Sequence, residues 1–254
     1  MDKNIIARNF SRCAHLYDRY ADIQQKAALG LLRHIEKNSY FKILEIGCGT
    51  GNYTLLLKKR FAHADLKAID ISAGMIDVAR SKPGNKGVEF LTGDAENVTF
   101  KGRFDLITSN ACFQWLENLE SSLIKYKDWL EDNGMFCFSM FGPLTFWELN
   151  AVIAEDALNN PVPAANFIDK DKIKEILKSN FKVIRFREIK YTESLFSLKH
   201  LLKKIKYTGV RGTGHYGPKV FTPCYLAKLQ KRYLEKFKEI RATYQVFYFL
   251  AKKG

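Results

Sequence analysis

The chain has few cysteines, and they do not form the patterns that bind metals or build disulfide frameworks. None of the five lies in a C-x-x-C pair, and an odd number cannot pair completely. The spacing argues against a zinc site and against a disulfide-stabilised secreted domain. We therefore expect reduced, mostly buried thiols and no bound metal. The cysteines are Cys13, Cys48, Cys112, Cys137 and Cys224.

Long apolar runs are also absent. A membrane-spanning helix needs about 20 consecutive apolar residues, and no segment approaches that length. The first residues, MDKNIIARNF, lack the apolar core of a signal peptide. We expect a cytoplasmic protein without a membrane partner. With 254 residues, the chain is long enough for one α/β domain with an elaboration.

Acidic residues are scarce in the last third of the chain, although they balance the basic residues before it. Residues 1–168 contain 19 Lys and Arg against 20 Asp and Glu, whereas residues 169–254 contain 22 against 7. Such asymmetry indicates an acidic or polyanionic partner, because uncompensated charge attracts and steers the opposite charge. A solvated, lysine-rich surface without a partner is the alternative.

The segment from Lys42 to Thr54, KILEIGCGTGNYT, is the strongest local signal. An apolar run that contains Glu45 is followed by glycines at positions 47, 49 and 51. This order predicts a strand, a tight turn and a helix, because glycine adopts backbone conformations that other residues avoid. A ligand can lie against bare main chain there, and the helix presents free N–H groups. A turn without a ligand is the alternative.

Two acids at the ends of later strand-like runs extend this signal. Asp70 closes the run DLKAID, where a carboxylate can accept two hydrogen bonds from a ribose diol. Asp94 and Ala95 follow the run VEFL, in a position to hold an adenine amino group. A dinucleotide-binding fold fits less well, because its third glycine falls three residues after the second, where this chain has Asn52.

The turn and the two acids together resemble the class I S-adenosylmethionine-dependent methyltransferases. In that family the glycine turn faces the methionine part of the cofactor. The resemblance implies S-adenosyl-L-methionine as cofactor, S-adenosyl-L-homocysteine as product, and no metal. The residues that carry it are Glu45-x-Gly47-x-Gly49-x-Gly51, then Asp70, then Gly93-Asp94-Ala95.

Strand-like runs alternate with helical periodicity along most of the chain, which predicts a parallel sheet with helices on both faces. The rhythm breaks before the last run, YQVFYFL, the candidate for the antiparallel seventh strand of this family. We therefore expect an α/β fold with a seven-stranded, mostly parallel, Rossmann-like methyltransferase sheet and helical cap insertions. The runs lie at 42–46, 65–70, 88–91, 104–109, 134–141, 182–191 and 244–251.

Three segments exceed what such a sheet needs. Residues 1–38 have the apolar spacing of one or two helices. Residues 144–165 contain a helix-like stretch and two prolines, and residues 194–238 contain two basic helices, about 194–207 and 222–238, around a glycine-rich loop. We interpret the last two segments as a cap that excludes water and shapes a substrate pocket. The chain is then a single class I methyltransferase domain over residues 1–254.

No general base is evident where the chemistry is expected. The sequence TSNA in and after the fourth run holds neither an acid nor a histidine, and the Asn/Asp-Pro-Pro-Tyr signature of DNA and some protein N-methyltransferases is missing there. Methyl transfer is an in-line displacement that chiefly needs the reacting atoms held in a row. A nucleophile that is already ionised, such as a carboxylate, therefore fits better than an amine.

A closer resemblance covers nearly the whole chain. NACFQWLENL from Asn110, the pattern from Phe10 to Gln24, KYTG from Lys206 and the ending YQVFYFL are similar to malonyl-[acyl-carrier protein] O-methyltransferases of biotin synthesis. The Asn110 stretch also resembles trans-aconitate methyltransferases. The cofactor motifs are highly specific to the superfamily, and the substrate motifs are only moderately specific to this member.

The resemblance implies roles along the cofactor. Glu45 anchors the turn or reaches the amino group through water, Asp70 binds the ribose, and Asp94 holds adenine. Tyr17 and Gln24 close over the methionine end, while Trp115 belongs to the pocket or the core. The expected cofactor contacts are Tyr17, Gln24, Glu45, Gly47, Cys48, Gly49, Gly51, Asp70, Ile71, Met75, Asp94, Ala95 and Asn110.

The substrate implied by the resemblance is a malonyl thioester on the phosphopantetheine arm of an acidic acyl-carrier protein. Its carboxylate attacks the methyl directly, and the methyl ester primes biotin (pimeloyl) synthesis. A donor should orient that carboxylate without binding it so tightly that it loses nucleophilicity. The expected catalytic residues are Tyr17, Asn110, Arg211 and His215.

The basic cap helices are the expected docking surface for the carrier. A small-molecule carboxyl methyltransferase of the trans-aconitate type would need no such surface. An RNA-modifying enzyme is the other alternative, but the basic cap has few stacking platforms and no appended RNA-binding motif, so nucleic acid is not the expected partner. The docking candidates are Lys199, Lys203, Lys204, Lys206, Lys228, Lys231 and Arg232.

Overall fold

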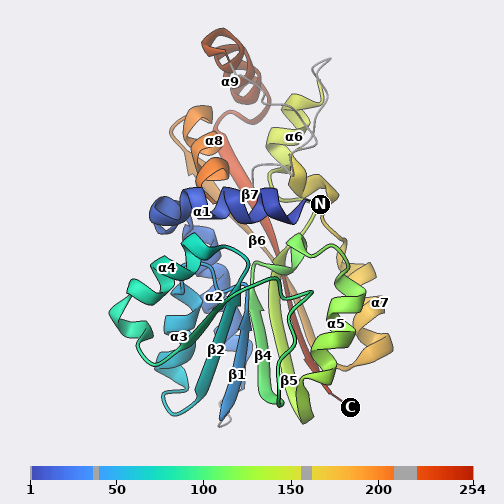
Figure 1. Ribbon diagram of the computed structural model, residues 1–254. Coiled ribbons are helices and arrows are strands. Elements are labelled where there is room, and N and C mark those ends of the chain that lie inside the picture. The colour runs from blue at the N-terminus through green and yellow to red at the C-terminus, as the bar shows by residue number, and fades with distance from the viewer. Residues whose placement is uncertain (1, 37–39, 156–161, 209–221, 254) are drawn as a thin grey trace.

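The described residues form one seven-stranded sheet flanked by helices (Figure 1). The structure, a computed structural model, describes residues 2–36, 40–155, 162–208 and 222–253, apart from the side chains of Val183 and Ile184. The strands are β1 Lys42–Ile46, β2 Asp65–Asp70, β3 Glu89–Thr92, β4 Phe104–Asn110, β5 Leu130–Phe141, β6 Lys182–Leu195 and β7 Ile240–Lys252.

The strand order is β3-β2-β1-β4-β5-β7-β6. The first five strands pair in parallel, and β7 lies antiparallel between β5 and β6. The predicted fold class and the antiparallel position of the last strand are therefore confirmed. Because the order reverses beside β1, the carboxyl ends of β1 and β4 border the crevice where α/β folds bind their ligands.

Helices cover both faces of the sheet. Residues of α2 and α3 share a buried cluster with β1, β4 and β7, while α5 and α7 share another with the opposite face of β4, β5 and β7. The helices are α1 Lys3–Tyr20, α2 Asp22–His34, α3 Asn52–Arg60, α4 Ala73–Ser81, α5 Leu119–Asp128, α6 Trp147–Ile153, α7 Lys170–Asn180, α8 Leu198–Tyr207 and α9 Pro223–Phe237, with short 3₁₀ turns at Pro83–Asn85, Phe113–Trp115 and Pro163–Asn166.

Helix α1 lies across the carboxyl ends of the strands and contacts α4 and α8 (Figure 1). Asp2 caps its start by accepting hydrogen bonds from the N–H groups of Asn4 and Ile5. Above it, α6, α8 and α9 form a second level, and they lie in the segments that were expected to form the cap (Figure 1). Two elements differ from expectation. Strand β6 continues through Leu195, into the segment expected to begin the second part of the cap, and α6 is only seven residues long.

The described residues contain neither a candidate membrane span nor a candidate metal cluster. No helix among them is both long and apolar enough to cross a membrane. Within the same ranges, His, Cys, Asp and Glu side chains form no group of three that could hold a metal ion.

Candidate functional site

The glycine turn after β1 is held by main-chain hydrogen bonds and by positive φ angles. The N–H groups of Gly47 and Cys48 both donate to the carbonyl of Ile69, at 2.8 and 3.1 Å, which fastens the turn to the end of β2. Gly47, Gly49 and Gly51 have φ of 71°, 54° and 78°, which a side chain would strain.

The three glycines nevertheless face different surroundings. A Cβ on Gly47 would overlap the side chain of Cys112, and one on Gly51 would overlap Asn85. A Cβ on Gly49 would meet no protein atom within 4 Å. Gly49 is therefore open to a ligand, whereas Gly51 lines neither cavity described below and shapes the turn instead.

Asp70 connects the glycine turn to the segment that follows β2. Its two carboxylate oxygens accept hydrogen bonds from the N–H groups of Gly49, at 2.8 Å, and Ser72, at 2.9 Å. Burial raises the pKa of the Asp70 carboxyl, while these two N–H groups oppose the rise. Each oxygen keeps lone-pair capacity for a hydroxyl donor, so the arrangement suits the predicted diol.

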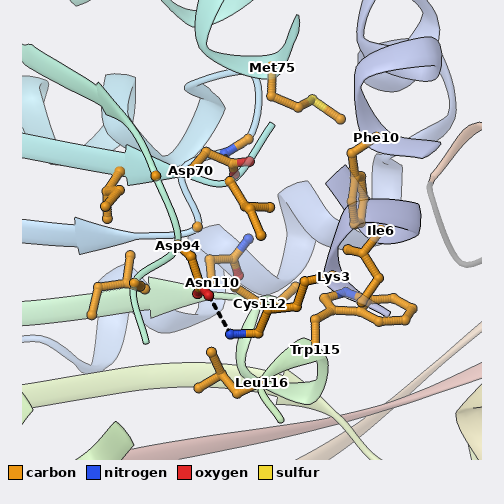
Figure 2. A pocket seen from close by; sticks show the side chains of 18 of the residues that line it. Lys3, Ile6, Phe10, Asp70, Met75, Asp94, Asn110, Cys112, Trp115 and Leu116 are labelled. Carbon is orange, nitrogen blue, oxygen red and sulfur yellow. Dashed lines mark hydrogen bonds and ion pairs between the residues drawn. The ribbon is translucent and has the colours of Figure 1, made fainter. Parts of the chain in front are cut away.

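A cavity opens in front of Asp70, and Figure 2 shows its lining. Its walls come from the carboxyl ends of the strands and from α1, which lies across them (Figure 1). Nine of the expected cofactor contacts line it, together with Trp115. Those nine are Tyr17, Gly47, Gly49, Asp70, Ile71, Met75, Asp94, Ala95 and Asn110. We call this space the main cavity.

Three of the four other expected contacts, Gln24, Glu45 and Cys48, line a second cavity that shares Tyr17, Gly47, Gly49 and Asn110 with the main one. We call it the inner cavity. Glu45 is buried and accepts a hydrogen bond from the Thr54 hydroxyl at 2.6 Å. Burial raises the pKa of Glu45 to about 8, the Thr54 bond opposes the rise, and Asp70 adds to it.

One polar atom of the inner cavity lacks a partner. The side-chain oxygen of Gln24 is buried and accepts no hydrogen bond from the described residues. An unpaired buried acceptor is costly unless a ligand satisfies it. Together with the open side of Gly49 and the buried acid Glu45, it fits a ligand that carries an ammonium group, as the methionine part of the implied cofactor does.

At the far end of the main cavity, Lys3 binds two acids. Its ammonium lies 2.6 Å from Asp94 and 2.5 Å from Glu96, and Figure 2 shows the first of these contacts. Asp94 also accepts from the Asn97 amide, so one carboxylate oxygen is shared by two donors. From the described residues, the other oxygen accepts only the N–H of Glu96, so it keeps capacity for an adenine amino group.

Lys3 was missed by sequence reasoning, as were Ile6 and Cys112, which also line the main cavity. Nothing local marks Lys3, because Asp94 is 91 positions away in the chain. Glu96 is held further by the N–H groups of Glu117 and Asn118. Burial alone would raise the pKa of Glu96, but Lys3 and these N–H groups together lower it.

We expect Lys3→Met to weaken cofactor binding by roughly tenfold, because Asp94 and Glu96 lose the cation between them and α1 loses a tie to the cavity wall. Calorimetric titration with S-adenosylhomocysteine measures the effect. The matched control is Lys67→Met, which removes a similar 2.6 Å pair with Glu89 away from the cavity. Equal affinities in the two variants would contradict the assignment of Lys3.

Both polar atoms of the Asn110 side chain form hydrogen bonds within the protein. Its amide nitrogen donates to the carbonyl of Gln24 at 3.1 Å, and its amide oxygen accepts from the Ser139 hydroxyl at 2.7 Å. These two bonds tie the end of β4 to α2 and β5, so the amide holds the cavity walls together. Trp115 contacts Phe10 of α1 edge to face, with ring centroids 6.0 Å apart, and belongs to the pocket.

Among the described residues, the cavity lining has acids but no histidine. Tyr17 lines both cavities, and burial raises its pKa, with the charges of Asp70 and Asp18 adding to the rise. Its phenol therefore stays protonated and can donate a hydrogen bond. Cys112 likewise remains a neutral thiol, since burial raises its pKa. An acceptor that enters already ionised needs nothing more from these walls.

The expected residues of the cap have mixed outcomes. Arg211 and His215 lie outside the described residues. Lys204 was expected on the docking surface, but that prediction is wrong: its side chain is 6% exposed and bound to Asp22 at 2.9 Å and Glu193 at 2.7 Å. Four docking candidates are exposed, whereas Lys206 and Arg232 are partly buried. The four are Lys199, Lys203, Lys228 and Lys231.

Known proteins resemble this chain over its full length. A profile of the family described as a methyltransferase domain matches residues 44–138. The malonyl-[acyl-carrier protein] O-methyltransferase of Priestia megaterium is 33% identical over 76% of this chain and 73% of its own. The enzyme of that name from Bacillus cereus is 31% identical over 100% of this chain and 99% of its own.

Solved structures share the fold at much lower identity. N-methyltransferase NodS from Bradyrhizobium japonicum, in complex with S-adenosyl-L-homocysteine, superposes with a TM-score of 0.54 at 14% identity. The match covers 90% of this chain and 86% of that one.

Proposed function

The chain belongs to the malonyl-[acyl-carrier protein] O-methyltransferase family, and from this premise we propose that it methylates the free carboxylate of a malonyl thioester on acyl-carrier protein. S-adenosylmethionine supplies the electrophilic methyl group and leaves as S-adenosylhomocysteine. The methyl ester hides a charge, so chain-extension enzymes accept it, and it primes biotin (pimeloyl) synthesis.

The observation that carries this proposal is that the described residues lining the two joined cavities include no histidine, and that each acid among them is already bonded to other protein groups. A carboxylate has lost its proton well below neutral pH and needs no base. An amine or hydroxyl acceptor would have to give up a proton during the reaction. The lining therefore favours a carboxylate over these acceptors.

The residues act by positioning. The main chain at Gly49 and the carboxylate of Asp70 hold the ribose side, and Asp94 with Lys3 behind it holds the adenine side. Glu45 and the Gln24 oxygen receive the ammonium group in the inner cavity. Tyr17, which lines both cavities, donates to the entering carboxylate, and a neutral donor orients it without the strong pairing that would reduce its nucleophilicity.

The test is transfer of labelled methyl from S-adenosylmethionine to malonyl-carrier protein, beside malonyl-pantetheine, free malonate, trans-aconitate and bulk RNA. We expect label on the carrier that mild base releases, as from an ester. Asp70→Ala serves as the control that loses transfer. Label on trans-aconitate or RNA alone would overturn the substrate and leave the cofactor assignment in place.

A further inference from the structure

A groove outside the catalytic cavities runs between α2 and the edge strand β6. Helix α2 and strand β6 form its two walls, and β6 pairs only with β7, so the groove lies at the end of the sheet. We call it the α2–β6 groove. Its lining consists of Lys26, Leu29, Gly30, Arg33, His34, Arg187, Ile189 and Tyr191.

Every charged side chain of this groove is a cation. Lys26, Arg33 and Arg187 are exposed, and no acid lines the groove. Hydrogen bonds or ion pairs to acids of the described chain are absent for all three, although acids neutralise Lys3, Lys67, Lys82 and Lys204 elsewhere. Uncompensated like charges around one hollow attract an anionic ligand or surface.

The uncompensated charge affects the pKa of His34. Burial lowers its pKa, and the nearby charges of Arg187 and Arg185 lower it further. The imidazole lies at the C-terminal end of α2, with its ring centroid 5.5 Å from that of Tyr248. An anion in the groove would offset the two arginines and favour the protonated imidazole.

The floor of the groove is apolar. Leu29 is 40% exposed there, beside Ile189 and Tyr191. Gly30 lets α2 pack close to the sheet: a Cβ at this position would lie 2.7 Å from the Tyr248 hydroxyl. That hydroxyl is hydrogen-bonded to the hydroxyl of Tyr191. An apolar floor between cations is complementary to an amphipathic helix with acidic flanks.

The groove also lies next to the catalytic site. Gln24 and Ala28 of α2 line the inner cavity, whereas Lys26, Gly30 and Arg33 of the same helix line the groove. A helix is about 10 Å across, so the two spaces are separated by roughly that distance. Lys204 of α8 binds Asp22 of α2 and Glu193 of β6, so α8 is tied to both elements that form the walls of the groove.

Cations along an edge strand also discourage pairing with other strands. That role accounts for Arg185 and Arg187 on β6, but not for Lys26, Arg33 and Leu29, which lie on a helix. Protection of the edge strand therefore does not explain why cations lie on both walls of the groove.

We propose that the α2–β6 groove docks an acidic helix of the carrier protein that presents the substrate, an inference that rests on the proposed function. The carrier is then held by α2 and β6, about one helix width from the inner cavity. This surface differs from the cap-only surface that sequence reasoning predicted.

The first test is the double charge reversal Lys26→Glu with Arg187→Glu. We expect KM for malonyl-carrier protein to rise at least tenfold, with kcat/KM for malonyl-pantetheine and the affinity for S-adenosylhomocysteine unchanged. The matched control is Lys101→Glu with Lys178→Glu, which makes the same change in net charge at exposed positions outside the groove. An unchanged KM, or an equal rise in both double variants, would overturn the groove.

A second test needs no turnover. The pKa of His34 is followed by NMR with and without saturating carrier protein that bears no malonyl group, and we expect carrier binding to raise it. No change on saturation would exclude occupation of the groove. If malonyl-pantetheine and malonyl-carrier protein are both inert, the proposed function fails; if both react and the reversal changes nothing, only the groove fails.

Discussion

Gly49→Ala is expected to abolish measurable cofactor binding, with Kd rising at least about 100-fold, in a protein that still folds. The added Cβ meets no protein atom within 4 Å and projects into the space that the cavities share. A 100-fold loss corresponds to about 2.7 kcal/mol of binding free energy. Calorimetric titration with S-adenosylhomocysteine measures the loss.

Two other glycine substitutions separate ligand exclusion from backbone strain. Gly87→Ala carries the same kind of strain, at φ 83° with open space around its Cβ, but lies outside both cavities, so it should cost about 1 kcal/mol of stability and leave Kd unchanged. Gly47→Ala should lose both stability and binding, because its Cβ overlaps Cys112. If Gly49→Ala and Gly87→Ala bind equally well, no ligand lies against Gly49.

Cofactor affinity should increase roughly tenfold between pH 6.5 and 8. The pKa of Glu45 is raised to about 8 by burial, so the carboxyl is largely protonated at pH 6.5 and cannot pair with an ammonium group. As pH rises through 8, Glu45 ionises and the ion pair forms. Titration with S-adenosylhomocysteine over this range gives the slope.

Glu45→Gln is the control, because a neutral amide of similar shape should remove the pH dependence and leave the weaker affinity. Stability without ligand must show the opposite sign. A carboxyl whose folded pKa lies above its unfolded value favours the folded state most at low pH, and that contribution is lost as pH rises from about 4.5 to about 8. A wild-type affinity that does not vary over this range would contradict the role of Glu45.

Local patterns predicted the sheet well. The runs 42–46 and 65–70 coincide with β1 and β2, and the last run forms the antiparallel β7. Strands β1 and β2 are short and bounded by glycine or polar turns, so their signals are contained in neighbouring residues. The longer strands were underestimated: β5 begins at Leu130 and β7 at Ile240, before the apolar runs that marked them.

The candidate site divides in the same way. Gly47 and Gly49 could be placed from their spacing in the turn, and Asp70 from its position at the end of the next apolar run. The pairing of Lys3 with Asp94 and the burial of Lys204 were not, because these contacts join residues 91 and 182 positions apart. A lysine in a basic helix gives no local sign of whether it faces water or a buried acid.

The sequence by itself determined the succession of strands and helices along the chain, the glycine turn and the acids at the strand ends. Periodicity and glycine conformation act over a few residues, so these features can be read from neighbouring positions. Only the tertiary structure decided which charges are neutralised. It buried Lys204 against two acids and set Lys3 in the wall of the main cavity. It also left Lys26, Arg33 and Arg187 around one groove without an acidic partner among the described residues. The physical reason is that charge pairing depends on distances across the fold, which the spacing of residues along the chain does not contain.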